Sequence, residues 1–390
     1  VMVATNHTQD PPLASHGQGR QHPVGSTMGT VDGQSPHRVH EARNGRASVA
    51  IRSRVPLRVS FAGGGTDVPP YPQTHGGVVL CAAIDRFAYA SLAPTADGTP
   101  FIAESLDYGI RAAYAHPSHL AFDGELDLLK ASLRRMAPDA VGGAHLSIHS
   151  DAPPGSGLGS SSAMTVAIVG ALSRWLDQPL TDYEVAHLAV VIEREDLAIE
   201  GGLQDQYACT FGGFNFIEFH HDAVVVNPLR VNPETLLELQ YTLLLVFTGT
   251  TRRSDGILAR QIQNYGVPGG AVQDALQELK HITLDMKRAL LQSRLDNFGA
   301  LLHAGWENKK RLATGITTPH IDEMYACALR AGAIGGKVLG AGGGGYLLLA
   351  CPETRRHAVA RACEQLGGTP APFQFEATGL RTWRADGGAR

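Results

Sequence analysis

The stretch Ala152-Pro-Pro-Gly-Ser-Gly-Leu-Gly-Ser-Ser-Ser-Ala163 joins a predicted strand to a predicted helix. Residues 145–149 alternate between polar and apolar side chains, as a strand does, and residues 163–175 carry apolar side chains at helical spacing. The glycines therefore lie at a helix N-terminus, where unpaired backbone N–H groups and the positive end of the helix dipole favour an anion. The stretch predicts a phosphate-binding loop.

Two common phosphate-binding patterns do not fit this loop. No lysine follows the glycines, as the pattern G-x-x-x-x-G-K-[ST] requires, and Ser160 stands where G-x-G-x-x-G has its third glycine. The alternative interpretation is a flexible turn whose serines cap a core helix. Two prolines, three alternating glycines and three serines are more than a cap needs, so a phosphate cradle is favoured.

The motif P-x-x-x-G-L-G-S-S in this loop resembles the second signature of the GHMP kinases, the family of galactokinase, homoserine kinase, mevalonate kinase and phosphomevalonate kinase. Residues Arg54–Asp67 look like the first signature, and residues Gly335–Gly345, which precede an apolar run, look like the third. The three motifs occur in the order typical of the family. This chain is therefore identified as similar to the GHMP kinases over most of residues 50–350.

The resemblance implies an α+β protein with the two-domain GHMP kinase fold. An S5-like N-terminal domain is expected at residues 49–225 and a ferredoxin-like C-terminal domain at residues 226–390, with the active cleft between them. Residues 1–48 are polar and show no hydrophobic period, which predicts a disordered tail. Residue patterns predict strands at 54–61, 78–92 and 239–247 and helices at 126–136, 163–175, 182–196, 272–305, 321–331 and 354–366.

Within the family, the sequence is similar to the heptose 7-phosphate kinase branch. Galactokinases and mevalonate kinases usually carry Gly-Glu-His where this chain has Gly63-Gly64-Gly65. The runs that resemble the heptose branch are Gly63–Tyr71, His75–Val79, Ile84–Asp85, Ile192–Leu197, Gln204–Ala208, Phe211–Phe219 and Thr248–Arg252. The resemblance implies an ATP- and Mg²⁺-dependent kinase that phosphorylates the anomeric hydroxyl of D-glycero-D-manno-heptose 7-phosphate to the 1,7-bisphosphate.

Phosphoryl transfer needs a phosphate cradle, a metal site, a base and a cation. The resemblance assigns the base to Asp205, the stabilising cation to Arg58, and the Mg²⁺ ligands to Ser161 and Glu193. Glu195 stays an alternative metal ligand, because it lies only two positions from Glu193. From the residues alone, Asp205 could instead cap a helix, Arg58 could be a surface charge, and the glutamates could form a solvated helix end.

The remaining expected contacts fall into two groups. The nucleotide is expected at Pro154, Gly155, Ser156, Gly157, Leu158, Gly159, Ser160, Ser161 and Ser162. Substrate binding is expected at Thr66, Asp67, Tyr71, Asp85, Arg252, Gly342, Gly343 and Gly344, where the three glycines would approach nucleotide phosphates or the opposing phosphate loop and the other residues the sugar phosphate. Arg252 is the first choice for the residue that binds the phosphate of the sugar, with Arg253 and Lys337 as alternates. Turn chemistry could explain Thr66 and Asp67 without a sugar contact. The glycines of the third motif allow close backbone approach, or form a plain bulge at a strand entry.

Composition bounds the remaining possibilities. The 390 residues are 43% hydrophobic with a formal charge of −4, which allows two domains and excludes the broad basic field of a nucleic-acid-binding protein. Five scattered cysteines and the lack of a long apolar run indicate a cytoplasmic protein without a membrane anchor. The expected partners are ATP and a small sugar phosphate, and the protein is expected to be a monomer or a homodimer.

Two other functions stay open. One is a kinase for a related sugar, such as an octose phosphate of secondary metabolism or free fucose. The feature that distinguishes these substrates is whether a cationic side chain faces the far end of the bound sugar. The other is a catalytically silent sensor of nucleotide and sugar. The joint presence of Asp205, Arg58 and Glu193 argues against a sensor, because binding alone does not need a base.

Overall fold

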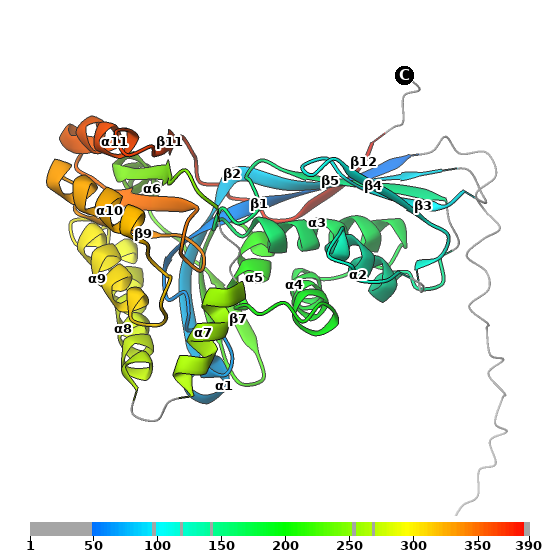
Figure 1. The fold of residues 1–390 in the computed structure, drawn as a ribbon, viewed down its shortest axis with the longest axis horizontal. Coiled ribbons are helices and arrows are strands. Elements are labelled where there is room, and N and C mark those ends of the chain that lie inside the picture. The colour runs from blue at the N-terminus through cyan, green and yellow to red at the C-terminus, as the bar shows by residue number, and fades with distance from the viewer. Residues whose placement is uncertain are drawn as a thin grey trace, which may run out of the picture. The chain divides into compact units, whose positions relative to one another are not determined.

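The structure is a computed structural model that describes residues 49–95, 99–117, 120–140, 143–251, 255–266 and 270–385. Residues 1–48, for which the sequence predicts a tail, lie outside the described residues, and so do Arg252 and Arg253. Figure 1 shows that helices and two β-sheets make up the described part of the chain. The predicted α+β class is confirmed.

The larger sheet has eight strands among the described residues and is arranged around a long strand, β2. Along one edge β2 pairs antiparallel with β1, and along the other its beginning pairs with β6 and its end with β5. The strands are β1 (Ala50–Ala62), β2 (Gly77–Pro94), β3 (Phe101–Ser105), β4 (Ile110–Tyr114), β5 (Ala144–Ser150), β6 (Phe214–Phe219), β7 (Val224–Pro228) and β12 (Arg381–Ala385).

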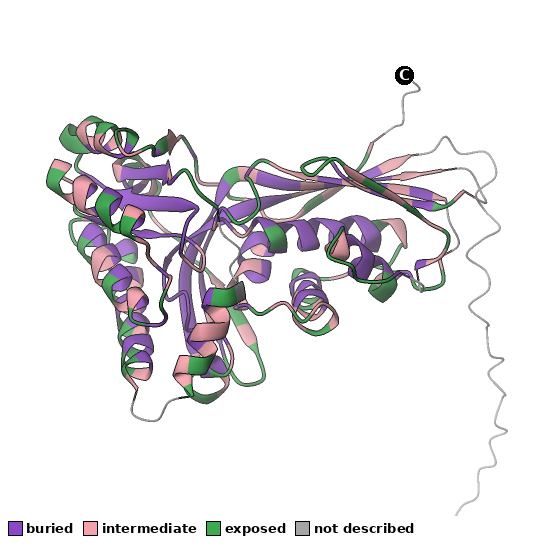
Figure 2. Ribbon diagram, viewed as in Figure 1, coloured by how far each residue is buried: buried purple, intermediate pink, exposed green. Residues whose placement is uncertain are grey.

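Helix α3 (Ser160–Trp175) packs on β1 and β2 of this sheet. Three shorter helices pack against α3 in turn: α2 (Asp127–Met136), α4 (Asp182–Val191) and α5 (Gln204–Phe211). Figure 2 shows that α3 is buried along most of its length. The phosphate loop is therefore anchored at its downstream end by a helix that has little freedom to move.

The smaller sheet has the strand order β11-β8-β10-β9, with every pairing antiparallel. Its strands are β8 (Leu243–Phe247), β9 (Gly335–Val338), β10 (Tyr346–Ala350) and β11 (Thr369–Ala371). The other helices are α1 (Tyr71–His75), α6 (Pro233–Thr242), α7 (Asp255–Tyr265), α8 (Ala271–Leu291), α9 (Phe298–Lys310), α10 (Pro319–Ala331) and α11 (Arg356–Glu364). Helix α9 lies against β9 and also reaches β1 of the larger sheet.

Two sequence-based boundaries were wrong. The strand predicted at 239–247 begins only at Leu243, because α6 runs to Thr242 after an Asn232 side-chain cap and a proline in its first turn. The helix predicted at 272–305 is two helices, because α8 ends at Leu291 and the chain turns through Ser293, whose φ is 55°. The proposed division at residue 225 falls inside β7, and β12 returns the C-terminal region to the larger sheet.

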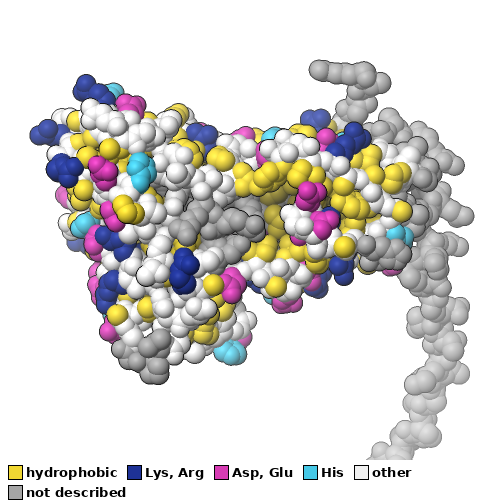
Figure 3. Space-filling view, viewed as in Figure 1, with side chains coloured by type: hydrophobic (Ala, Val, Ile, Leu, Met, Phe, Trp, Pro, Cys, Tyr) yellow, Lys and Arg dark blue, Asp and Glu magenta, His cyan; other side chains and the backbone are white. Residues whose placement is uncertain are grey.

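On the face shown in Figure 3, Lys and Arg side chains are interspersed with Asp and Glu and do not gather into one basic patch. This distribution agrees with a formal net charge of −4. None of the helices in the described ranges has both the length and the apolar character that crossing a membrane requires.

Candidate active site

Arg58 lies on β1 and is almost completely buried, with 2% of its surface exposed. Its Nε and Nη2 atoms donate hydrogen bonds to the two carboxylate oxygens of Asp205, at 2.8 and 2.7 Å, and its Nη1 atom donates to the Gly157 carbonyl at 2.6 Å. Burial by itself lowers the pKa of the Arg58 guanidinium, but the negative charge of Asp205 helps to reverse this effect and the pKa is raised. Arg58 is thus an interior cation that joins a carboxylate to the phosphate loop, and not a surface charge.

Asp205 lies in the first turn of α5 and keeps 24% of its side chain exposed. The N-cap position of this helix is Leu203, whose side chain makes no cap, and Asp205 is the second helical residue, so Asp205 does not have the capping role that the sequence left open. Each carboxylate oxygen accepts one N–H group of Arg58 and retains a further lone pair. A hydroxyl group can therefore donate a hydrogen bond to Asp205 from its exposed side.

The phosphate loop enters α3 through Gly159, whose φ of 76° is in the left-handed region. No side chain caps α3, so the serines do not form the cap that the sequence left as an alternative. The first N–H groups of a helix that has no side-chain cap are suited to bind an anion. A side chain at Gly159 would contact both Arg58 and Asp205, with its Cβ 3.4 Å from their nearest atoms. The loop therefore brings a helix N-terminus next to the ion pair.

The third glycine motif packs directly against the phosphate loop. A Cβ atom on Gly340 would lie 2.7 Å from the Gly157 Cα atom, and the Tyr346 N–H group donates to the Ser156 carbonyl at 3.0 Å. Residues 342–344, predicted to bind substrate, pack closely on two other loops. A Cβ atom on Gly342 would lie 2.5 Å from the Ile316 carbonyl oxygen, and a Cβ atom on Gly344 would lie 2.9 Å from the Thr250 carbonyl oxygen. The Gly343 N–H group donates to the Ile316 carbonyl. These glycines permit close backbone packing of the two loops, and their contact with a substrate stays a prediction.

Glu193 is buried, with 2% of its surface exposed, whereas Glu195 is exposed. A π-helical turn at Ile192–Asp196 contains both glutamates, a local irregularity that is common at functional sites. Burial raises the pKa of the Glu193 carboxyl, and the neighbouring Arg194 offsets part of that effect. The solvated helix end that the sequence left open is thus excluded for Glu193.

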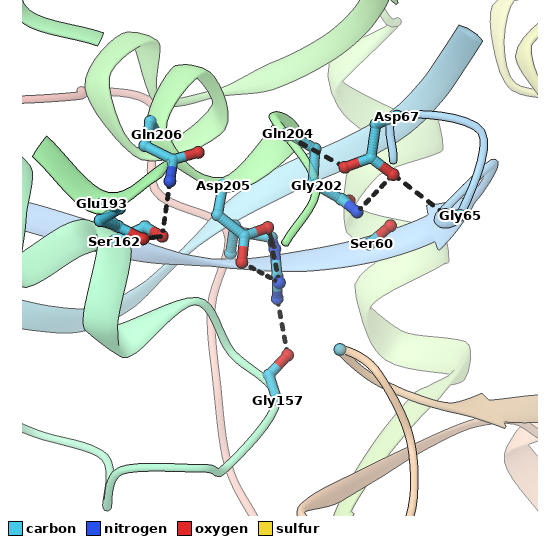
Figure 4. A network of polar contacts seen from close by, with 12 residues as sticks. Ser60, Gly65, Asp67, Gly157, Ser162, Glu193, Gly202, Gln204, Asp205 and Gln206 are labelled. Carbon is cyan, nitrogen blue, oxygen red and sulfur yellow. Dashed lines mark hydrogen bonds and ion pairs between the residues drawn. The ribbon is translucent and has the colours of Figure 1, made fainter. Parts of the chain in front are cut away.

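Ser162 contacts Glu193, and Ser161 lies exposed at the start of α3. The Ser162 hydroxyl donates to Glu193 Oε2 at 3.1 Å and accepts a hydrogen bond from Gln206 Nε2 at 3.0 Å (Figure 4). The other carboxylate oxygen of Glu193 is buried and makes no hydrogen bond of normal geometry, although Thr165 and Gln206 are close enough to lower its pKa. The metal role of Ser161 stays a prediction, and Ser162 is a further candidate.

These residues fit a magnesium ion. Mg²⁺ prefers hard oxygen ligands and usually takes few of them from the protein. Glu193 offers a carboxylate oxygen that makes no hydrogen bond of normal geometry within the described part of the chain, and the phosphate loop offers serine hydroxyls. Among the described residues no group of three or more His, Cys, Asp or Glu side chains could hold a metal by itself. Nucleotide phosphates and water would therefore supply the other ligands.

The Thr66 side chain is engaged within the first motif. Its hydroxyl oxygen lies 2.8 Å from the Gly63 carbonyl and 2.9 Å from the Val78 carbonyl, which share its one hydrogen, and it accepts the Val78 N–H group at 3.0 Å. These bonds hold the first-motif loop against the beginning of β2. These contacts agree with the turn chemistry that the sequence left as an alternative, and a contact between Thr66 and the sugar stays a prediction.

Asp67 is fully buried at the end of the same loop. Its carboxylate accepts the N–H groups of Gly65 at 2.9 Å and Gln204 at 3.1 Å. Any side chain at Gly202 would clash with it, since a Cβ atom there would lie 1.9 Å from Asp67 Oδ2. Asp67 therefore links the first motif to α5 beside Asp205, as Figure 4 shows.

The other two predicted sugar contacts, Tyr71 and Asp85, form hydrogen bonds with other parts of the chain. Tyr71 is buried, and its hydroxyl donates to Gln277 Oε1 at 3.2 Å. Asp85 is exposed on β2 and accepts the Gln374 N–H group at 2.7 Å. The hydrogen bonds described for Asp85 thus connect it to the C-terminal segment and not to the ion pair, and its sugar contact stays a prediction.

Lys309, near the end of α9, is a site residue that the sequence did not predict. Only 6% of it is exposed, and its ammonium group donates to the Gly340 carbonyl at 2.5 Å. Burial lowers the pKa of Lys309 from 10.5 to about 8, and the Asp67 carboxylate offsets part of that effect. In the sequence it stands in Asn308-Lys309-Lys310, which is typical of the solvated basic end of a helix. No local signal marks it as buried.

Lys337, which the sequence left as an alternate phosphate ligand, lies on β9 with 4% of its surface exposed. Its ammonium group donates to the Ser60 carbonyl at 2.8 Å. Burial lowers the pKa of Lys337 far below its ordinary value, and the neighbouring charge of Lys309 lowers it further. The smaller sheet therefore contributes a second interior lysine beside β1.

Comparisons with known proteins agree with this arrangement. The domain described as "GHMP kinases N terminal domain" matches residues 127–213, and "GHMP kinases C terminal" matches residues 286–368. The chain is 36% identical to the D-glycero-alpha-D-manno-heptose 7-phosphate kinase of Campylobacter jejuni, over 86% of this chain and 99% of that protein. It is 27% identical to an L-fucokinase/L-fucose-1-P guanylyltransferase of Bacteroides fragilis, over 83% of this chain but only 37% of that protein.

A solved structure gives the same result. The crystal structure described as a D-glycero-D-manno-heptose 1-phosphate kinase from Bacteroides thetaiotaomicron is 37% identical and superposes with a TM-score of 0.72, covering 85% of this chain and 98% of that chain. Both family domains, the extended sequence identity and the shared fold lead to one conclusion. The chain belongs to the GHMP kinase family.

Proposed function

We propose that this protein is an ATP-dependent kinase that phosphorylates the anomeric hydroxyl of D-glycero-D-manno-heptose 7-phosphate and yields the 1,7-bisphosphate. One observation carries the proposal: the Arg58–Asp205 ion pair contacts Gly157 of the phosphate loop. A hydrogen-bond acceptor for a hydroxyl, a cation and a phosphate loop are the parts that phosphoryl transfer to an alcohol needs. The choice of a heptose is supported by the names of the two relatives that are 36% and 37% identical.

In the proposed reaction the oxygen of the anomeric hydroxyl attacks the γ-phosphorus of ATP. A new P–O bond forms while the bond between the γ-phosphorus and the β,γ-bridging oxygen breaks, and ADP leaves with the electron pair of that bond. The hydroxyl proton passes to the Asp205 carboxylate, which then releases it to solvent on its exposed side.

Arg58 orients the carboxylate in this scheme. Its Nε, Nη1 and Nη2 atoms each donate one hydrogen bond inside the protein, so two of its five N–H groups remain. The bidentate contact fixes the plane of the Asp205 carboxylate. The fixed positive charge of Arg58 next to Gly157 also stabilises negative charge that develops on the transferred group.

The first turn of α3 would bind the nucleotide phosphates through its backbone N–H groups. Glu193 would hold Mg²⁺ together with a serine of the loop, either Ser161 by resemblance or Ser162 by its contact with Glu193. Bound Mg²⁺ supplies positive charge that offsets the charge of the nucleotide phosphates. Five free thiols among the described residues are in keeping with a reducing cytoplasm, where we place the protein.

The acceptor would lie beside Asp67, whose carboxylate accepts the N–H group of Gln204, the residue before Asp205. Arg252 is proposed from the sequence alone as a ligand of the sugar phosphate, because a guanidinium offers two parallel charge-assisted hydrogen bonds. Arg252→Ala should raise the KM for the phosphosugar by about 30- to 150-fold, the equivalent of about 2–3 kcal/mol, with little change in the KM for ATP. Equal weakening of both substrates would place Arg252 at the nucleotide.

The proposal is tested with the purified protein, ATP, Mg²⁺ and a panel of sugars. The panel contains D-glycero-D-manno-heptose 7-phosphate, the 1-phosphate of the same heptose, an octose phosphate and free L-fucose, and ³¹P NMR locates each new phosphate. We expect the 7-phosphate to react fastest and to gain a phosphate at C1. Fastest turnover of L-fucose would instead favour the function for which the Bacteroides fragilis relative is named. A protein that binds these ligands without turnover would be a sensor.

A further inference from the structure

The ammonium groups of Lys309 and Lys337 lie inside the protein with no carboxylate of the described residues paired to either. Their hydrogen bonds run to backbone carbonyls, Lys309 to Gly340 at 2.5 Å and Lys337 to Ser60 at 2.8 Å. An ammonium group has three donors, so each lysine keeps donors that a ligand can use. A neutral side chain such as Gln could bond the same carbonyls without the free-energy cost of burying a charge. The positive charge therefore needs another explanation.

The charges around the two lysines do not balance. The interior cluster contains three basic groups, Arg58, Lys309 and Lys337, and two carboxylates, Asp67 and Asp205. It carries one unmatched positive charge when all three basic groups are protonated, a form that burial disfavours for both lysines. Arg58 already uses the Asp205 carboxylate in a bidentate ion pair, and the oxygens of Asp67 accept backbone N–H groups. An anion placed next to the lysines would complete the charge balance of this cluster.

Gly64 leaves a small space in front of Lys309. A Cβ atom on Gly64 would lie 3.6 Å from Lys309 Nζ, 3.6 Å from Ser60 Oγ and 3.4 Å from Gln204 Nε2. Ser60 is 3% exposed, and its hydroxyl has no hydrogen-bond partner among the described residues; neither has the side-chain oxygen of Gln204. Three polar groups therefore converge on a point where the chain has no side chain. A hydrogen-bonding ligand would satisfy them.

This space lies on the acceptor side of the ion pair. In Figure 4 Asp205 separates Glu193, Ser162 and Gln206, the proposed metal side, from Asp67 and Ser60. Lys309 interacts electrostatically with Asp67, Arg58 and Asp205, which belong to the middle and to the acceptor side. Lys309 also donates to Gly340, which packs on Gly157 of the phosphate loop, so the lysines lie where the acceptor side meets that loop.

We propose that Lys309 and Lys337 bind the phosphate group that the acceptor already carries, with the Ser60 hydroxyl as a third donor. The inference rests on the proposed function and deepens it, because it adds two residues of α9 and β9 to Arg252 as ligands of the phosphate on the sugar. A phosphate offers acceptor oxygens to both ammonium groups and supplies the missing negative charge. The same cations would give an uncharged sugar no comparable advantage.

Two charge-removing variants, Lys309→Met and Lys337→Met, test the inference by kinetics. We expect the KM for D-glycero-D-manno-heptose 7-phosphate to rise at least 10-fold in each, while kcat changes less and the KM for ATP stays within about 2-fold. The unphosphorylated heptose should react equally well in wild type and variants. Lys280→Gln is the matched control, because Lys280 also donates to carbonyls, those of His75 and Gly76, but lies outside this cluster.

A binding measurement without nucleotide separates this inference from the proposed function. The heptose 7-phosphate, and inorganic phosphate in a second series, should raise the Tm of the wild type and of Lys280→Gln, and should raise it less in both methionine variants. This result is expected even if turnover favours another sugar. A wild type that the phosphosugar stabilises no more than the free sugar does would overturn the inference.

Two kinetic outcomes would also overturn it. A fall in kcat for phosphorylated and free sugar alike, with an unchanged KM, would mean that the lysines serve the group in transfer. Unchanged kinetics in both folded variants would mean that Lys337 only ties β9 to β1 and that Lys309 only ties α9 to Gly340.

Gly64→Ala keeps the test decisive if a lysine variant fails to fold. Its methyl group would make ordinary contacts at 3.4–3.6 Å, so the fold should tolerate it, but it would fill the space in front of Lys309. We expect an unchanged Tm and a KM for the phosphosugar raised at least 10-fold. A normal KM in this variant would exclude a ligand at that point.

Discussion

The Arg58 guanidinium and the Asp205 carboxylate meet through two parallel hydrogen bonds, at 2.8 and 2.7 Å, although 147 positions separate the two residues in the chain. Arg58 is 2% exposed and Asp205 24%, so one partner is held in the interior while the other faces an approaching substrate. Packing of α5 against β1 creates this pair.

Asp205→Asn should lower kcat by at least about 100-fold, because an amide cannot take the proton from the sugar hydroxyl. The affinity for nucleotide should be retained. The substitution should also lower the free energy of unfolding by about 3 kcal/mol, because Arg58 would lose its counter-charge in the interior. Steady-state kinetics, nucleotide titration and urea unfolding measure the three quantities. Asp182→Asn, at an exposed first-turn position of α4, is the control and should change none of them. Near-normal turnover in a folded Asp205→Asn protein would remove Asp205 as the base.

Glu193→Gln should raise the Mg²⁺ concentration needed for half-maximal activity by about 10-fold or more, because the buried carboxylate is the proposed metal ligand. Glu195→Gln is a control from the same π-helical turn and should behave as wild type, since Glu195 is exposed. A Mg²⁺ titration of activity and of ADP binding distinguishes the two. A larger effect at Glu195 would reverse the assignment.

Ser161→Ala and Ser162→Ala separate the two serines by the same Mg²⁺ titration. If Ser162 is the ligand, its alanine variant should show the larger shift, because it removes the contact with Glu193. If Ser161, at the exposed start of α3, is the ligand, Ser161→Ala should show the larger shift in the Mg²⁺ titration. Equal and small effects would exclude both hydroxyls.

The activity should depend on the charge of Lys309. With a pKa of about 8, Lys309 loses its proton as the pH rises through 8, so kcat/KM for the phosphosugar should fall above that pH. Bound phosphate stabilises the charged form, so the corresponding fall in kcat should occur at higher pH. The charged groups that face Lys309 are Asp67, Arg58, Asp205 and Lys337. Lys309→Arg stays charged, so its kcat/KM should not fall above pH 8. If the variant shows the same fall as wild type, Lys309 is not the group that causes it.

The same shift predicts how stability varies with pH. The lowered pKa means that the folded state disfavours the charged lysine, a penalty that is fully present below about pH 8 and relieved as the pH rises towards 10.5. Its size is on the order of 3 kcal/mol. Relative to wild type, Lys309→Met should therefore gain stability near pH 7 and lose that gain by pH 10.5, as measured by urea unfolding at several pH values.

Gly340→Ala should separate the third motif from the phosphate loop. Its φ is 67°, and a Cβ atom would lie 2.7 Å from the Gly157 Cα atom, so both backbone strain and a clash arise. We expect a lower Tm and a KM for ATP raised about 10-fold or more. Gly367→Ala is the control for strain alone, because Gly367 also has a positive φ of 81° but no atom within 4 Å of an added Cβ. Equal effects in both variants would show that the loop contact is unimportant.

Features that depend only on neighbouring residues were predictable from the sequence. The helix predicted at 163–175 is confirmed as α3, and the helix predicted at 182–196 is confirmed as α4 with its π-helical turn. Helical spacing and a glycine-rich entry are local properties, because backbone hydrogen bonds in a helix join residues four apart. The three glycine-containing motifs, in their typical order, also indicate the α+β kinase fold, because each motif is a short local pattern.

The tertiary structure alone decided which charged side chains are interior. Arg58, Glu193 and Lys309 each have sequence neighbours that suit a solvated position, and each is buried by elements distant in the chain. Lys309 reaches the site because α9 packs on β9 and β1, which no pattern around residue 309 encodes. Burial and the pairing of charges are sums over long-range contacts, so local sequence can nominate a charged residue but cannot place it next to its partner.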